Sequence, residues 1–213
     1  LATMVEEAGT EFVARMDGDD ICLPRRFERQ INFLQSNPTI SLVGGQIECI
    51  NEKGELLTKD LWSTYPLRHA DIVSRMMVLG PFNHPSIMFR IRAILDVGNY
   101  AVPAPIEDHC LYLKLVQNYA VGNLQDICVK YRIHSKSICA TAQKDNLHNR
   151  LALTHTAAEA EHIFGITKQV FLKLRERDHP ISIVPLVKSA LFRSRKENIR
   201  VQDILFSQDF ITA

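Results

Sequence analysis

The sequence lacks several signals that define common classes of protein. It contains five cysteines and no C-x-x-C pair, which argues against a zinc ribbon or a disulfide scaffold and fits a reducing compartment. No apolar run approaches the ~18 residues that a membrane-spanning helix needs. The formal net charge is +1, so composition gives no reason to expect nucleic acid as a partner. These absences leave a soluble globular class as the default.

The residues that are present support one domain with an appendage. Of the 213 residues, 46% are hydrophobic and 23% are charged, which is enough for a sizeable core. Strand and helix signals alternate up to about residue 138, which predicts an α/β domain over 1–138. Only helical patterns follow, so 139–213 is expected to be an α-helical C-terminal region. Strands are expected at 11–16, 40–50, 85–89 and 127–131, and helices at 24–36, 71–78, 90–97, 108–117, 140–164, 167–178, 181–196 and 201–206.

Local patterns refine this reading. Phe27, Ile31 and Leu34 are spaced by four and three, which predicts one apolar helix face toward the core. Gly44-Gly45 inside the strand at 40–50 indicates a bulge or a close approach of another chain segment. The stretch 51–54, Asn-Glu-Lys-Gly, predicts a turn that opens a hairpin.

A cluster of carboxylates follows the first strand. Asp17, Asp19 and Asp20 stand in "MDGDD", and ligands of open α/β sheets sit at the carboxyl ends of strands. Two carboxylates separated by Gly18, which lets the backbone bend, can face one ligand and suit Mg²⁺ or Mn²⁺, with a substrate diphosphate completing the shell. The alternative is an acidic turn that caps the next helix. An EF-hand is poorly supported, since Leu23-Pro24 interrupts the required spacing.

A second acidic pair opens a later helix. Glu107 and Asp108 follow a proline-rich loop. A carboxylate with an ordinary pKa of about 4 is ionised and accepts a hydroxyl proton, and a like charge beside it raises that pKa. The alternative is an acidic helix N-terminus favoured by the helix dipole.

Histidines provide weaker signals. His134 follows a strand end in "YRIH", where it is either structural or a ligand to metal or phosphate. His84 in "NHPS" is uninformative by itself. His155, Glu159 and His162 share one helix face, but the order His-Glu-x-x-His of zinc proteases is missing, which favours a solvated face.

These motifs, in this order, resemble those of bacterial family 2 glycosyltransferases. "EFVARMDGDDICLPRRFERQINFLQSNPTISLVGGQIECINEKGE" is similar to the metal-binding segment of that family. "NHPSIMFR", "VGNY", "IEDHCLYLKL" and "YRIHSKS" resemble the family's later motifs. The similarity covers roughly residues 1 to 140 and is specific as a set.

The resemblance implies a GT-A fold, with a mixed sheet flanked by helices, and it implies roles for individual residues. Asp17 and Asp19 match the Asp-x-Asp pair that engages the nucleotide sugar and its Mn²⁺ or Mg²⁺, and Asp19 is the expected direct ligand. Asp20 matches a less defined third acid in the donor site. The remaining matches are Asp108 as catalytic base with Glu107 beside it, His134 as a residue that completes the metal or diphosphate site, and Arg132 and His84 as residues that shape the pocket.

The implied reaction is a metal-dependent glycosyl transfer with inversion. Its implied partners are a nucleotide-sugar donor and a saccharide or lipid-linked acceptor, in bacterial surface polysaccharide or lipopolysaccharide assembly. A cytoplasmic location is expected. The basic C-terminal helices present either a solvated face or a surface that docks peripherally on the inner face of the membrane.

One departure limits the match. The family begins with two strands and a Pro-Thr/Ser-Tyr-Asn-like segment that bind base and ribose, whereas this chain begins with a segment similar to the helix before the metal motif. A partial GT-A domain is therefore expected, with an exposed sheet edge that favours self-association. The alternative function is an inactive remnant or interaction module. A phosphoryl-transfer enzyme is disfavoured because no glycine-rich phosphate loop is present.

Overall fold

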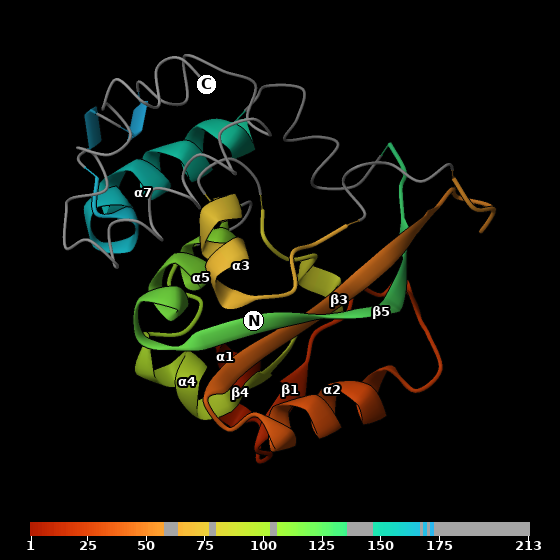
Figure 1. Cartoon of the computed structure of the whole chain (residues 1–213). Helices are drawn as coiled ribbons and strands as arrows, with labels where there is room; N and C mark the ends of the chain where they lie inside the picture. The colour runs from red at the N-terminus through yellow and green to blue at the C-terminus, as the bar shows by residue number, and fades with distance from the viewer. Residues whose placement is uncertain are drawn as a thin grey trace.

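The structure, a computed structural model, describes residues 1–57, 64–76, 80–102, 106–135 and 147–172, the last range without 167 and 170. It consists of one mixed sheet with helices on both faces (Figure 1). The strands are β1 (Phe12–Ala14), β2 (Ile21–Cys22), β3 (Ile40–Ile50), β4 (Met88–Arg90) and β5 (Ala120–Arg132). The helices are α1 (Ala2–Glu7), α2 (Arg26–Ser36), α3 (His69–Met76), α4 (Ile91–Asp96), α5 (Glu107–Asn118) and α7 (Leu147–Phe164), with a 3₁₀ turn, η2 (His84–Ser86).

The strand order places three strand ends together. The order is β1-β4-β3-β5-β2, with β3 and β5 paired in parallel and the other pairs antiparallel. Because β4 runs opposite to both β1 and β3, the strands β1, β3 and β5 all point the same way. β1 and β2 lie at opposite edges, so the segment 15–20 that joins them crosses the carboxyl ends of β3 and β5. This is the edge where α/β sheets bind ligands.

The long strands β3 and β5 carry the two halves of the core. Neighbouring side chains of a strand point to opposite faces, so Leu42 packs among residues of α3 and α5 while Val43 packs with Leu34 of α2. Figure 1 shows α2 on one side of these strands, and α3, α5 and α7 on the other. The predicted α/β class, a mixed sheet flanked by helices, is confirmed.

The buried face of α2 differs from the expected apolar stripe. Leu34 is fully buried, but Phe27 is 48% exposed, and the other buried side chains of the helix are Arg26 and Gln30. The guanidinium of Arg26 donates to backbone oxygens at the end of β1 and before β4, and its Nε donates to Gln30. The expectation for Phe27 is wrong because these polar groups find buried partners that periodicity does not reveal.

Two glycines permit close packing of β3 against its neighbours, as expected. A Cβ atom on Gly45 would lie 2.2 Å from Cys128 Sγ, and one on Gly44 would lie 2.1 Å from Asn123 Oδ1. The register shifts between Gly44 and Gln46. Gly18 is different: it lies outside the left-handed region, and a Cβ there would meet no atom within 4 Å. The bend of the acidic turn therefore does not depend on glycine.

Other predicted elements are largely recovered. The turn at 51–54 opens a hairpin in which Ile50 bridges Leu56, with Gly54 at a φ of 84°. The strand expected at 85–89 is shorter, because η2 precedes β4. The strand expected at 127–131 begins earlier, at Ala120. Beyond 139, α7 falls within the helix predicted at 140–164, whereas 181–196, 201–206 and most of 167–178 lie outside the described residues.

Candidate functional site

The acidic turn gathers three carboxylates over the carboxyl ends of the strands. One potential ligand atom from each of Asp17, Asp19 and Asp20 lies within 4.8 Å of the other two. Ligands of a Mg²⁺ ion sit about 2.1 Å from the metal and therefore at most about 4.2 Å from one another. A small closure of these side chains would bring them to that spacing. Within the described part of the chain, this is the one group of three or more His, Cys, Asp or Glu side chains placed so closely.

Asp20 is the buried member of this group. Only 8% of the residue is exposed, and its Oδ1 accepts the backbone N–H of Arg132 at 2.8 Å. Burial raises the pKa of Asp20 to about 6, the N–H of Arg132 opposes that rise, and the negative charges of Asp19 and Asp17 add to it. The buried Oδ2 accepts no hydrogen bond from the described residues. A bound cation would supply the partner that this oxygen lacks.

Asp19 is the exposed member and pairs with His134. The imidazole Nε2 lies 2.9 Å from Asp19 Oδ2, and the Asp19 side chain is 45% exposed. His134 lies two residues after β5, so the turn that follows β1 meets the end of β5 here. The histidine therefore lies beside the carboxylate cluster and contacts it through Asp19, and its role at a metal or diphosphate stays a prediction.

Arg132 holds the acidic turn through hydrogen bonds to the main chain. Its Nε donates to the backbone oxygen of Asp19 at 2.8 Å, and its Nη1 donates to those of Asn51 and Glu52 at 2.9 and 3.0 Å. All three acceptors are main-chain oxygens, two of them in the hairpin turn after β3. The guanidinium thus joins the acidic turn to the hairpin, which fits the predicted role in shaping the pocket.

Asp17 is held by a cation to which the sequence argument assigned no role. Arg15 Nη1 donates to Asp17 Oδ2 at 2.7 Å, and Arg15 Nη2 lies 2.6 Å from Oδ1. The arginine is part of the motif, but the motif does not show that its side chain folds back onto the turn. Each of the three carboxylates consequently has a different partner.

A second group forms around the start of α5. Asp108 Oδ2 lies 4.0 Å from His84 Nδ1, and His84 Nε2 lies 3.0 Å from the hydroxyl of Tyr100. Burial lowers the pKa of His84 to about 3, with the charge of Arg15 adding to the effect. His84 is therefore neutral at pH 7, so its contact with Asp108 is not an ion pair. The motif VGNY contains Tyr100, but the sequence assigned no role to this tyrosine because its contact with His84 appears only in the fold.

Glu107 and Asp108 diverge although they are neighbours. The Oε2 of Glu107 is buried and accepts no hydrogen bond from the described residues, while the Asp108 side chain is 23% exposed. Burial raises the pKa of Tyr100, and the charges of Asp108 and then Glu107 add to that rise. Asp108 is therefore the more accessible of the two carboxylates. The raised pKa expected for Asp108 itself stays a prediction.

Arg15 lies within electrostatic reach of both groups. Its charge lowers the pKa of Asp20 in the acidic turn and the pKa of His84 beside Asp108. The charge of Arg15 thus acts on both the carboxylate cluster and the group around Asp108. The described residues of α7, which include His155, Glu159 and His162, contain no comparable cluster of metal-binding side chains. Glu159 accepts a hydrogen bond from Gln117 instead.

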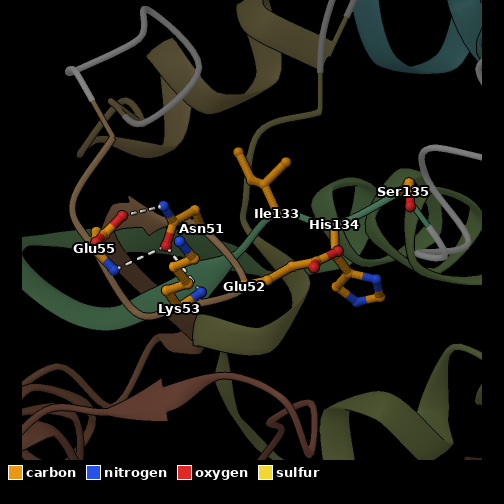
Figure 2. A pocket seen from close by; sticks show the side chains of 7 residues that line it. All are labelled: Asn51, Glu52, Lys53, Glu55, Ile133, His134 and Ser135. Atoms are coloured by element: carbon orange, nitrogen blue, oxygen red, sulfur yellow. Dashed lines mark hydrogen bonds between the residues drawn. The ribbon is translucent and has the colours of Figure 1, made fainter.

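A hollow adjoins the acidic turn on the side of His134. Figure 2 shows this hollow, about 530 Å³ in volume, between the hairpin turn and the residues after β5. Asn51 accepts the backbone N–H groups of Lys53 and Glu55, which fixes the hairpin turn that forms one wall. The lining residues are Asn51, Glu52, Lys53, Glu55, Ile133, His134 and Ser135. His134 is common to the hollow and the carboxylate cluster.

Comparison with known proteins finds the family that the motifs resemble. Residues 1–98 match Glycosyl transferase family 2, and this range contains the acidic turn and His84. This part of the chain is therefore similar to family 2 glycosyltransferases. The resemblance drawn from the motifs is confirmed, and the family match agrees with the GT-A assignment.

Several of the curated relatives are bacterial glycosyltransferases. The amylovoran biosynthesis glycosyltransferase AmsE of Erwinia amylovora is 36% identical over 135 residues, which are 63% of this chain and 49% of the relative. The O-antigen biosynthesis glycosyltransferase WbnJ of Escherichia coli is 37% identical over 59% of this chain and 48% of its own length. A UDP-Gal:alpha-D-GlcNAc-diphosphoundecaprenol beta-1,3-galactosyltransferase of Escherichia coli is 30% identical over 60% of this chain and 46% of its own length. The chain thus spans about half the length of the curated relatives it matches.

Among solved structures, TarS of S. aureus matches 95% of this chain and 41% of its own chain, with a TM-score of 0.46 and 13% identity. The family assignment rests on the sequence matches. None of the helices in the described part of the chain has the length and apolarity that a bilayer crossing requires.

Proposed function

We propose that the chain is part of a metal-dependent, inverting glycosyltransferase that moves a sugar from a nucleotide-sugar donor to an acceptor hydroxyl. The observation that carries this proposal is the convergence of three carboxylates, one of them with an unpartnered buried oxygen, at the carboxyl ends of the strands. The family match gives that cluster its chemical context. Bacterial polysaccharide or lipopolysaccharide assembly is the proposed setting, by analogy with the relatives' names.

The acidic turn fits a divalent cation. Carboxylate oxygens are the ligands that Mg²⁺ and Mn²⁺ prefer, and Asp19, Asp17 and Asp20 offer them within 4.8 Å. His134 orients Asp19 through their hydrogen bond, in the manner of a residue that supports a ligand from behind. Such a cation supplies charge neutralisation to the diphosphate of the leaving group.

Asp108 is the proposed general base. It lies at the start of α5 with its carboxylate partly exposed, and it is the accessible member of the acidic pair. In the bound complex it takes the proton of an acceptor hydroxyl within about 3 Å, and that oxygen attacks the anomeric carbon on the face opposite the leaving group. This attack inverts the configuration. Neutral His84, held by Tyr100, adds no second positive charge beside the base.

The proposed acceptor is a saccharide, free or linked to a lipid. The hollow beside His134 offers amide, carboxylate and ammonium side chains, which suit a ligand rich in hydroxyl groups. One relative's name specifies a diphosphoundecaprenol-linked acceptor, which is the basis for including lipid-linked sugars. The basic helical segments proposed for peripheral membrane docking at the cytoplasmic face lie outside the described residues.

A second candidate function is a non-catalytic remnant that retains the fold. The observation in its favour is that Asp17 and Asp19 already pair with Arg15 and His134, so neither carboxylate needs a metal as its partner. Binding of a nucleoside diphosphate in the presence of Mn²⁺ separates the two candidates, because a remnant has no reason to retain it.

The test is titration calorimetry with Mn²⁺ and UDP. We expect UDP to bind the wild-type chain only when Mn²⁺ is present, and Asp19→Ala to weaken that binding by about tenfold or more, since a ligand to the cation is lost. The matched control is Asp126→Ala, because Asp126 is also exposed and paired with a cation, Arg29, at 2.6 Å. If the wild-type chain does not bind UDP, or Asp19→Ala binds it as tightly, the remnant is the better account.

A further inference from the structure

Arg15 is held by a single carboxylate, that of Asp17 in the acidic turn. Nη1 donates to Oδ2 of Asp17 at 2.7 Å and Nη2 lies 2.6 Å from Oδ1, while only 17% of the arginine side chain is exposed. Such bidentate pairs use the planar fork of the guanidinium, which matches the geometry of a carboxylate and of a phosphate equally well. Asp17 therefore occupies Arg15 in the way that a phosphate oxygen pair would.

The backbone of Arg15 is fixed on two sides. Its N–H donates to the Ile87 oxygen at 3.0 Å, and its own oxygen accepts Nη2 of Arg26 at 2.8 Å. Arg26 is 1% exposed, so this anchor is part of the core. The main chain at Arg15 is thus rigid, and a change of partner requires rotation of the side chain alone.

The location of Arg15 suits the binding of an anion between the carboxylate cluster of the acidic turn and the group around Asp108. Its charge acts on Asp20 in the carboxylate cluster, and on His84 and Tyr100 beside Asp108. A diphosphate leaving group has to lie between the cation ligands and the reacting sugar, and the base has to act on the far side of that sugar. Arg15 is the described cation that reaches both groups.

We propose that Arg15 binds the donor diphosphate, and that the Arg15–Asp17 pair holds the guanidinium in place until the diphosphate replaces Asp17 as its partner. This assignment rests on the proposed function. A cation at the acidic turn gives Asp17 a second partner, so release of Arg15 leaves no carboxylate unpaired. The competing explanation is a structural pair that only stabilises the turn.

The two explanations predict different signs for two binding constants. Removal of Arg15 takes a positive charge away from the carboxylate cluster, so affinity for Mn²⁺ alone rises severalfold. The same change removes two charge-assisted hydrogen bonds to the diphosphate, so affinity for UDP at saturating Mn²⁺ falls by about tenfold or more. A structural pair makes both affinities fall together, because its loss disorders the turn.

The experiment is calorimetry of Arg15→Gln and Arg15→Lys with Mn²⁺, then with UDP and with inorganic pyrophosphate at saturating Mn²⁺. We expect opposite changes in Arg15→Gln, the same loss for pyrophosphate as for UDP, and an intermediate loss in Arg15→Lys, which keeps the charge without the fork. Arg29→Gln is the control, because Arg29 also pairs with an aspartate, at 2.6 Å, away from the acidic turn.

Two results would overturn the assignment. If UDP affinity in Arg15→Gln equals that of the wild type, Arg15 does not touch the diphosphate. If the Mn²⁺ and UDP affinities decrease together, the pair is structural. Both results leave the proposed function intact, whereas a wild-type chain that does not bind UDP contradicts the proposed function and this assignment with it.

Discussion

At the scale of single residues, three carboxylates of one turn have three environments. Asp17 pairs with a guanidinium, Asp19 with an imidazole, and Asp20 is buried against a backbone N–H. Their spacing in the sequence predicted that they face one ligand, and the structure brings their side chains within 4.8 Å of one another. The environments of Asp17 and Asp19 depend on Arg15 and His134. These two residues are far apart in the sequence and come together only in the fold.

The pH dependence of stability tests whether the His84 ring beside Asp108 is buried in its neutral form. Its folded-state pKa of about 3 lies below the ordinary value of 6.5, so the fold favours the neutral ring. That contribution to stability is present above pH 6.5 and is lost as the pH falls through 6.5 toward 3. Between pH 7 and pH 4.5, we expect the wild type to lose roughly 2–3 kcal/mol more unfolding free energy than His84→Gln.

Urea denaturation at the two pH values measures this difference, because other groups titrate alike in both proteins. Equal losses for the wild type and His84→Gln would show that the ring is protonated without penalty. The polar contact between His84 and Asp108 would then be an ion pair at acidic pH.

At the scale of elements, α2 illustrates what a pattern of apolar residues can and cannot predict. Helix α2 and strand β3 were located correctly, because apolar residues recur with the period of each element. The buried face of α2 was predicted wrongly. Arg26 and Gln30 are buried there because they donate hydrogen bonds to backbone carbonyls that are distant in the sequence. Gln30, for example, donates to Ser86 and Val43. Such partners are defined only when the sheet has formed.

This face predicts an unusual ranking of two substitutions. Arg26→Met removes hydrogen bonds to the buried oxygens of Arg15 and Ile87, and we expect a loss of about 2–4 kcal/mol in unfolding free energy. Phe27→Ala removes an exposed ring, and we expect a loss below about 1 kcal/mol. Chemical denaturation of both variants provides the comparison. A larger loss for Phe27→Ala would favour the apolar stripe that the sequence suggested.

At the scale of the whole molecule, the site is formed by segments that follow three different strands and by the start of one helix. The acidic turn follows β1, the hairpin follows β3, His134 follows β5, and Asp108 opens α5. The sequence predicted these positions through their motifs, but Tyr100 and Arg15 gained a role only from their place in three dimensions. β1 is an outer strand of the sheet in the described part of the chain, and self-association through an exposed edge stays a prediction.

The central claim is that Asp108 and the acidic turn together transfer a sugar. The most direct measurement is the rate of UDP release from UDP-galactose, and from a panel of other nucleotide sugars, by the wild type and Asp108→Asn with Mn²⁺. We predict release by the wild type, a rate lower by about 10²–10⁴-fold in Asp108→Asn, and unchanged UDP affinity in the variant, because a lost base affects chemistry and not binding. Equal rates in the two proteins, or no release by either, would contradict the account.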